Sequence, residues 1–144
     1  PLPAEEFSAK KVALFRLAHF ERILVDSMVL CSFVPWGAER SMAILKDVTG
    51  WDTSLVEMLR VSERTLNLAR VFLIREGVTS ADDTLPDRTF TPHVGGPASA
   101  KKPYDRQGFE KAKKYYYSLM GWDEKGVPTP ETLEQLDIAW ATLK

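Results

Sequence analysis

Apolar residues recur every three to four positions along most of this chain, a spacing that places them on one face of an α-helix. The pattern predicts helices over 6–31, 38–48, 53–76 and 105–120, and a last helix that opens at 129 and runs through 139. No run of alternating apolar and polar residues indicates a strand. We therefore expect an all-α fold, an irregular multi-helix domain.

The first predicted helix is apolar around nearly its whole circumference. A helix of this kind is usually buried on several sides, so we expect it to lie at the centre of the domain. Pro35 prevents the helix from continuing, because proline lacks an N–H and restricts the residue before it. Its apolar residues are Phe7, Leu14, Phe15, Leu17, Ala18, Phe20, Ile23, Leu24, Val25, Met28, Val29 and Leu30.

Residues that commonly end or begin helices flank the later segments. Gly50, Gly77 and Gly121 stand where each preceding helix should stop. Asp52 occupies a position suited to the N-cap of the third helix. Thr129-Pro130-Glu131 combines a capping hydroxyl, a proline in the first turn and an acid that the helix dipole favours.

Residues 78–104 differ from the rest of the chain. Four prolines and two adjacent glycines deny this stretch long regular structure. A loop of this length in a compact domain is usually functional or wrapped over other elements, and we expect it to lie irregularly over the helices. These residues are Pro86, Pro92, Gly95, Gly96, Pro97 and Pro103.

Length and composition indicate one ordinary globular domain. The chain has 144 residues, of which 44% are hydrophobic and 27% charged. A net charge of −1 gives no bulk electrostatic case for binding nucleic acid or an anionic membrane. Arg16, Glu21, Arg22 and Asp26 interrupt the best candidate for a membrane-spanning run. We expect neither nucleic acid nor membrane as a partner.

The first residues and the single cysteine bear on where the protein works and on whether the chain is a fragment. The first residues, Pro1-Leu-Pro-Ala-Glu-Glu6, lack the basic and apolar regions of a signal peptide. A single cysteine excludes an internal disulfide and favours a reducing compartment, so we expect a cytoplasmic protein. Because no methionine opens the chain, we expect a fragment of a longer protein.

Cys31, the only cysteine, has three interpretations. A lone cysteine among apolar residues is typically a small buried hydrophobe. A nucleophile needs a base, but His19 lies more than three helical turns earlier, and His93 is the only other histidine. An iron–sulfur cluster is commonly held by four thiolates, so a cluster on Cys31 would take its other ligands from elsewhere.

Asp26 has two interpretations. Arg22 lies four residues earlier, so an ion pair along the helix explains the carboxylate at a few tenths of a kcal/mol. Alternatively, Asp26 and Leu30 are one helical turn apart and face a similar direction. The carboxylate and the free carbonyls of the last turn would then offer acceptors to a ligand that donates N–H groups.

Three further groups have both a functional and a structural reading. Asp82-Asp83 suggests a metal pair, but adjacent acids in a turn more often cap or face water. Tyr115-Tyr-Tyr117 suggests an aromatic platform, but helical spacing divides such a trio between core and surface. The alternation of charged and apolar residues over 63–77 is typical of a helix with one buried and one salt-bridged face.

Three ordered blocks resemble the C-terminal, third, helical domain of the tungsten-containing aldehyde ferredoxin oxidoreductases. The first is Asp26-Ser-Met-Val-Leu-Cys31-Ser-Phe33. The second comprises Thr49-Gly-Trp-Asp52, Glu63-Arg-Thr-Leu-Asn-Leu-Ala-Arg70, Arg75-Glu-Gly77 and Asp82-Asp-Thr-Leu-Pro-Asp-Arg88. The third comprises Tyr115-Tyr-Tyr-Ser-Leu-Met-Gly-Trp-Asp123, Gly126-Val-Pro-Thr-Pro130 and Leu133. Together they span roughly residues 10–138.

The resemblance implies that residues 1–144 form one domain of a three-domain enzyme. Such enzymes hold tungsten or molybdenum through two pterin (molybdopterin-type) cofactors beside a [4Fe–4S] cluster, oxidise aldehydes to carboxylic acids and pass electrons to ferredoxin. By the same resemblance Asp26 contacts the pterin, Leu30 supplies an adjacent backbone contact, and Cys31 is the fourth cluster ligand. It assigns no catalytic residue to this chain, so the isolated domain is expected to be inactive.

Two alternatives remain open within the resemblance. Aryl-CoA reductase subunits look like the same family, and a helical scaffold that kept the fold would carry no redox site of its own. The family's three-cysteine motif, first pterin-binding segment and catalytic acids are absent from this sequence. The remaining domains, ferredoxin and a small aldehyde are therefore the expected partners.

Overall fold

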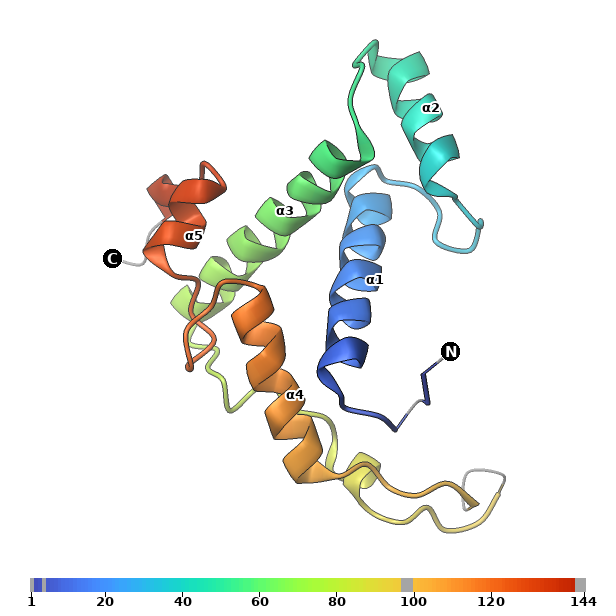
Figure 1. Ribbon diagram of the computed structural model, residues 1–144, viewed down its shortest axis with the longest axis vertical. Helices are drawn as coiled ribbons and strands as arrows, with labels where there is room; N and C mark the ends of the chain where they lie inside the picture. Colours follow the sequence, from blue (N-terminus) through green and yellow to red (C-terminus); the bar gives the residue numbers. More distant parts are fainter. Residues whose placement is uncertain (1, 4, 97–99, 142–144) are drawn as a thin grey trace.

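The computed structural model describes residues 2–3, 5–96 and 100–141, and its described part confirms the all-α fold class. Over these residues no strand forms, and the only ladder-type contact is an isolated bridge between Trp122 and Pro128. The elements, shown in Figure 1, are α1 (Ala9–Ser27), α2 (Ala38–Thr49), α3 (Leu55–Arg75), the 3₁₀ turn η1 (Asp87–Phe90), α4 (Arg106–Leu119), α5 (Pro130–Gln135) and the 3₁₀ turn η3 (Ala139–Ala141).

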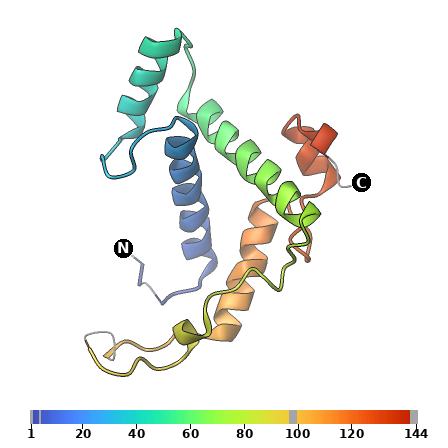
Figure 2. The ribbon, with the colours of Figure 1, turned by 180° about the vertical axis from the view of Figure 1, so that it is seen from behind.

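Three long helices form the frame of the domain. α1 packs against both α3 and α4, whereas α2 projects beyond the ends of α1 and α3 (Figures 1 and 2). A second packing unit joins the C-terminal half of α3 to α5 and η3. Its buried side chains are Val71, Leu133, Leu136, Ile138 and Ala141, with Leu68 against them.

Side chains satisfy the exposed N–H groups at the start of each long helix except α2. Ser8 accepts from Lys11 N in α1, and Asp105 accepts from the first turn of α4. Thr129 caps α5 as the sequence predicts, with Pro130 behind it. The prediction of Asp52 as the N-cap of α3 is wrong: Ser54 caps that helix, in a reciprocal box with Glu57.

The first helix is shorter and more exposed than its apolar pattern predicts. It ends at Ser27 instead of Cys31, because Val29 adopts a left-handed conformation (φ 56°) and Leu30 N donates back to Val25 O. Only one side of α1 packs against α3 and α4. Buried residues are Val12, Phe20 and Leu24, whereas Leu14, Phe15 and Leu17 are 54%, 56% and 52% exposed.

The last predicted helix is also interrupted. α5 ends at Gln135, because Asp137 takes a left-handed conformation (φ 57°) before η3 begins. Asp tolerates this conformation better than most residues. The break turns Ile138 and Ala141 back toward α3, where both are buried.

Within the segment 78–104, residues 78–96 and 101–104 are irregular, as the prolines and glycines predict, apart from η1. Figure 1 shows its first part running beside α3 and α4 and its later part projecting past the start of α4. Tyr104 N donates to Thr89 O (3.0 Å) and closes the base of this projection. Pro97 lies outside the described residues.

No helix among the described residues is long and apolar enough to cross a membrane.

Candidate functional site

Asp26, Leu30 and Cys31 lie around the C-terminal end of α1, but not on one helical face. Only Asp26 belongs to the helix; Leu30 and Cys31 follow the left-handed turn at Val29. The expectation that Asp26 and Leu30 are one helical turn apart is therefore wrong. The turn forms because the N–H groups of Met28, Val29 and Leu30 donate to carbonyls of the last helical turn.

The side chain of Cys31 is exposed, which excludes its interpretation as a small buried hydrophobe in this structure. Its carbonyl is held in place, because it accepts from Trp36 Nε1 (2.7 Å) and Val34 N (3.2 Å). These bonds fold residues 31–36 into a compact turn beside α1. The backbone of Cys31 is thus held in place, whereas its sulfur is exposed to solvent.

The carboxylate of Asp26 accepts a hydrogen bond from Arg22 Nε at 3.1 Å. This is the i,i+4 ion pair that the spacing predicts, and both side chains are about half exposed. Pairs of this kind contribute under about 1 kcal/mol, so a stronger partner would readily displace Arg22.

The free acceptors expected at the helix end are largely taken. The carbonyls of Leu24, Val25 and Asp26 accept from the following turn. The carbonyl of Leu30 accepts no hydrogen bond from any residue that the structure describes. The Leu30 carbonyl and the Cys31 thiol therefore remain available here, together with the Asp26 carboxylate in its exposed pair with Arg22.

Neither histidine serves Cys31. His19 Nδ1 is 2.9 Å from the Tyr116 hydroxyl, and its ring packs on Phe15 and Tyr116. Burial lowers the pKa of His19 and raises that of Tyr116 to about 12, so both groups are neutral near pH 7. His93 is exposed in the projecting segment. A cysteine–histidine nucleophile is not assembled among the described residues.

A charged cluster that the sequence reasoning did not single out lies between α3 and α4. Arg70, of which only 4% is exposed, forms two hydrogen bonds with Asp83 (2.9 and 2.6 Å) and a third with Gly126 O (2.7 Å). Tyr117 also donates to Asp83, and the Arg70 guanidinium lies 4.9 Å from the Trp122 ring centre. The sequence contains one sign of this cluster. Arg70 follows Leu66 on the apolar face of α3, and an arginine buried there requires a carboxylate partner.

The pKa of Asp83 reflects two opposing causes. Partial burial raises it, but hydrogen bonds from Arg70 and Tyr117 and the nearby cations together lower it below the ordinary value. The pKa of Tyr117 is raised by burial and by its bond to Asp83. Asp82 caps Thr79 N (2.8 Å) instead of joining Asp83, so the adjacent acids form no metal pair.

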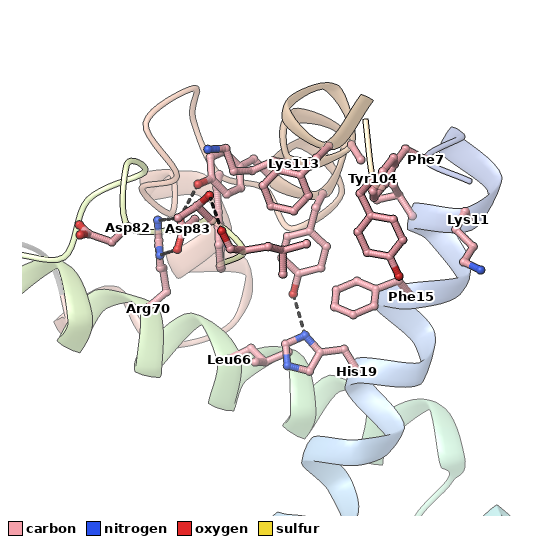
Figure 3. Close-up of a pocket in the computed structure, with 18 of the residues that line it drawn as sticks. Phe7, Lys11, Phe15, His19, Leu66, Arg70, Asp82, Asp83, Tyr104 and Lys113 are labelled. Carbon is pink, nitrogen blue, oxygen red and sulfur yellow. Dashed lines mark hydrogen bonds and ion pairs between the residues drawn. The ribbon is translucent and has the colours of Figure 1, made fainter. Parts of the chain in front are cut away.

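A cavity of about 750 Å³ opens between α1, α3, α4 and residues 82–85 (Figure 3). Its wall is mainly apolar, with the Arg70–Asp83 pair at one end. Apolar side chains on the wall are Phe7, Val12, Phe15, Leu66, Ala69, Leu73, Leu85, Phe109 and Ala112. Across the described residues, no group of three or more His, Cys, Asp or Glu side chains could hold a metal ion.

Fold and site together define an all-α domain with one exposed thiol and no complete metal site among its described residues. Residues 1–138 match the family model described as aldehyde ferredoxin oxidoreductase, domains 2 and 3. The chain belongs to the aldehyde ferredoxin oxidoreductase family.

Curated relatives agree with the family model. The chain is 33% identical over 138 residues to a tungsten-containing aldehyde ferredoxin oxidoreductase of Pyrococcus furiosus, which covers 93% of this chain and 22% of that protein. The corresponding protein of Thermococcus kodakarensis is 32% identical over 138 residues, with the same coverage. A P. furiosus aliphatic sulfonate oxidoreductase, WOR-like subunit, is 30% identical over 147 residues, 97% of this chain and 22% of that protein. The chain thus spans about a fifth of the length of these relatives.

A solved structure shares the fold. The active-site complex BamBC of benzoyl coenzyme A reductase, in complex with 1,5-dienoyl-CoA, superposes with a TM-score of 0.67 at 21% identity. The match covers 83% of this chain and 18% of the solved chain. At this identity, the similarity concerns the helical architecture alone.

Proposed function

We propose that this chain is the C-terminal helical domain of a tungsten- or molybdenum-pterin oxidoreductase that oxidises a small aldehyde to its carboxylic acid. Electrons would pass through a [4Fe–4S] cluster to ferredoxin, and the enzyme would work in the cytoplasm. The domain would contribute contacts to both cofactors and would be inactive alone. Family membership over residues 1–138 is the observation that carries the proposal.

The exposed Cys31 thiol supports a role as the fourth cluster ligand. An iron ligand must present its sulfur outward when the other three thiolates come from another part of the enzyme. Cys31 does so on a backbone fixed by Trp36 and Val34. Soft thiolate sulfur also suits iron and the heavier metals of such sites.

Asp26 and Leu30 support the pterin contact in a different way. The Asp26 carboxylate and the Leu30 carbonyl are both acceptors, and the N–H groups of a pterin are donors. The cofactor would supply the redox chemistry, while these groups would only orient it. The weak Arg22 pair leaves the carboxylate available for this bond.

The test uses variants of the full-length enzyme. Cys31→Ala should lose the [4Fe–4S] cluster or convert it to a three-iron form, and should stop electron transfer to ferredoxin. Asp26→Asn replaces one acceptor oxygen with a donor, so pterin and tungsten occupancy should fall. Iron, tungsten and molybdenum analysis and electron paramagnetic resonance of the reduced enzyme measure both effects.

Two control variants separate these roles from structural ones. Arg22→Ala breaks the ion pair but removes no proposed cofactor contact, so cofactor content should stay normal. Ser32→Ala changes the residue beside Cys31 without touching a thiol, and should also leave the cluster intact. Full metal content and unchanged cluster signals in Cys31→Ala and Asp26→Asn would refute the assignment.

A further inference from the structure

The cavity between α1, α3 and α4 is framed by aromatic rings. Phe7 meets Tyr104 and Phe109 edge to face, with ring centres 5.5 and 6.1 Å apart. Phe15 meets Tyr116 in the same manner at 5.5 Å. A volume of about 750 Å³ lies within the range of small-molecule sites, and such edge-on frames accept a further aromatic ring.

The charged groups on the cavity wall all have partners within the chain, and two of the cations are paired with carboxylates. Arg70 pairs with Asp83, and Lys113 Nζ lies 2.9 Å from Glu110 and 3.1 Å from Ser80 O. The other charged groups have partners too: Lys11 donates to the carbonyls of Leu2 and Pro3, Glu6 accepts from Ser8, and Asp82 accepts from Thr79. A charged ligand would therefore compete with a carboxylate for Arg70 or Lys113, and with hydrogen bonds of the chain at the other charged groups.

One hydroxyl group on the cavity wall has no hydrogen-bond partner among the described residues. The hydroxyls of Tyr116 and Tyr117 bond to His19 and Asp83, respectively. The Tyr104 hydroxyl bonds to no residue that the structure describes. Figure 3 shows the Tyr104 side chain pointing toward Phe15, within the aromatic part of the wall.

We propose that this cavity binds a neutral, mainly aromatic molecule with one hydrogen-bond-accepting oxygen, held by the Tyr104 hydroxyl between the rings of Phe7, Phe15 and Phe109. Aryl ketones and aryl esters have this chemistry. The mainly apolar wall disfavours a charged ligand, because a charge buried there would lose its hydration. The proposal does not depend on the roles assigned to Asp26 and Cys31.

The experiment uses the full-length enzyme and fluorine NMR of three matched probes. 4′-Fluoroacetophenone is neutral and has a carbonyl oxygen, 1-ethyl-4-fluorobenzene lacks the oxygen, and 4-fluorobenzoate is an anion. A ketone of this kind cannot be oxidised to the acid without breaking a carbon–carbon bond, so binding is measured apart from aldehyde turnover. The ketone should bind more tightly than either of the other probes.

Variants place the binding at this cavity. Tyr104→Phe removes only the hydroxyl, so affinity for the ketone should fall about fivefold, the equivalent of one neutral hydrogen bond, while that for the ethylbenzene should not change. Ala112→Leu extends a side chain on the wall and should weaken both. Tyr115→Phe is the matched control, because Tyr115 lies on α4 but not on the cavity wall.

Three outcomes would overturn the proposal. Equal affinity for the ketone and the ethylbenzene would show that no hydrogen bond to the ketone oxygen contributes to binding. A ketone affinity unchanged in Tyr104→Phe would place the ketone elsewhere. No ketone binding by the wild-type enzyme at millimolar concentration would mean that other parts of the enzyme fill the cavity. Metal content and cluster signals are measured separately, so failure here leaves the redox proposal standing.

Discussion

Val29 holds a backbone conformation that β-branched residues rarely adopt. Its φ of 56° lies in the left-handed region, where the branched Cβ crowds the following carbonyl and costs about 1–2 kcal/mol. The side chain is 91% exposed, so packing offsets little of this cost. The residue nevertheless stands at the turn that ends α1 and presents Leu30 and Cys31.

Val29→Gly should stabilise the 144-residue chain by about 0.5–1 kcal/mol. Relief of the left-handed strain exceeds the added chain entropy of glycine, which costs about 0.5–1 kcal/mol. The free energy of unfolding by urea measures the change. Val94→Gly is the control, because Val94 is also exposed but has no positive φ, and it should be neutral or destabilising. A less stable Val29→Gly variant would contradict this account of the turn.

At the scale of elements, the Arg70–Asp83 pair attaches the segment after α3 to the helices. Arg70 extends from α3, Asp83 lies in the irregular segment, and Tyr117 reaches the same carboxylate from α4. Arg70 also holds Gly126 O in the turn before α5. Four parts of the chain thus meet at one buried guanidinium, which explains how an irregular segment keeps a fixed position.

Asp83→Asn should destabilise the chain by about 2 kcal/mol at pH 7, because it leaves Arg70 buried without its counter-ion. The pKa of Asp83 is lowered on folding, so its carboxylate stabilises the fold above the unfolded pKa of about 4. That stabilisation is lost as the pH falls through the lower pKa of the folded state.

Urea unfolding of wild type and Asp83→Asn between pH 3 and 7 measures this effect. The difference in unfolding free energy should be largest near neutral pH and should shrink below about pH 4. Asp47→Asn, at an exposed position on α2, should change stability by less than about 0.5 kcal/mol. A difference that does not vary with pH would mean that the lost hydrogen-bond geometry, not the charge, matters.

The cap of α3 is the second prediction at this scale. Ser54 accepts from Glu57 N, and the Glu57 carboxylate accepts from Ser54 N at 2.7 Å. Ser54→Ala should therefore cost about 1 kcal/mol of unfolding free energy. Thr53→Ala is the matched control, since Thr53 bonds the Glu57 side chain without capping a backbone N–H. Equal losses in both variants would argue against the capping box.

At the scale of the molecule, several large apolar side chains of the long helices are exposed. Leu14, Phe15 and Leu17 of α1 and Phe72 of α3 are each more than half exposed. The chain also spans about a fifth of its relatives' length. Both observations favour a domain whose surface is covered by the rest of a larger enzyme.

The isolated 144-residue chain should bind neither the cluster nor the pterin stably. One thiolate cannot replace four, and Asp26 with Leu30 offers only a fraction of the acceptors that a pterin needs. Metal analysis of the purified chain, after expression with iron and tungsten supplied, measures this. Stoichiometric iron and tungsten would contradict the prediction.

The sequence by itself determined the helical class, the bounds of α2, α3 and α4 to within two residues, and the family. These features depend on neighbours within a few positions: apolar spacing, capping at Thr129, and the left-handed glycines at 50 and 121. The family resemblance likewise rests on short ordered blocks. The roles of Asp26, Leu30 and Cys31 follow from that resemblance and stay predictions.

Tertiary structure alone decided which of these residues meet. The pairing of Arg70 with Asp83, Tyr117 and Gly126 joins positions 13 to 56 residues apart, and no local pattern encodes such distances. The early end of α1 is a local feature that the apolar pattern did not reveal, because short-range hydrogen bonds of the turn override the unfavourable conformation of Val29. The exposure of α1 could not be predicted either. Apolar spacing indicates that a helix face is buried in the complete protein, but not whether residues of this chain bury it.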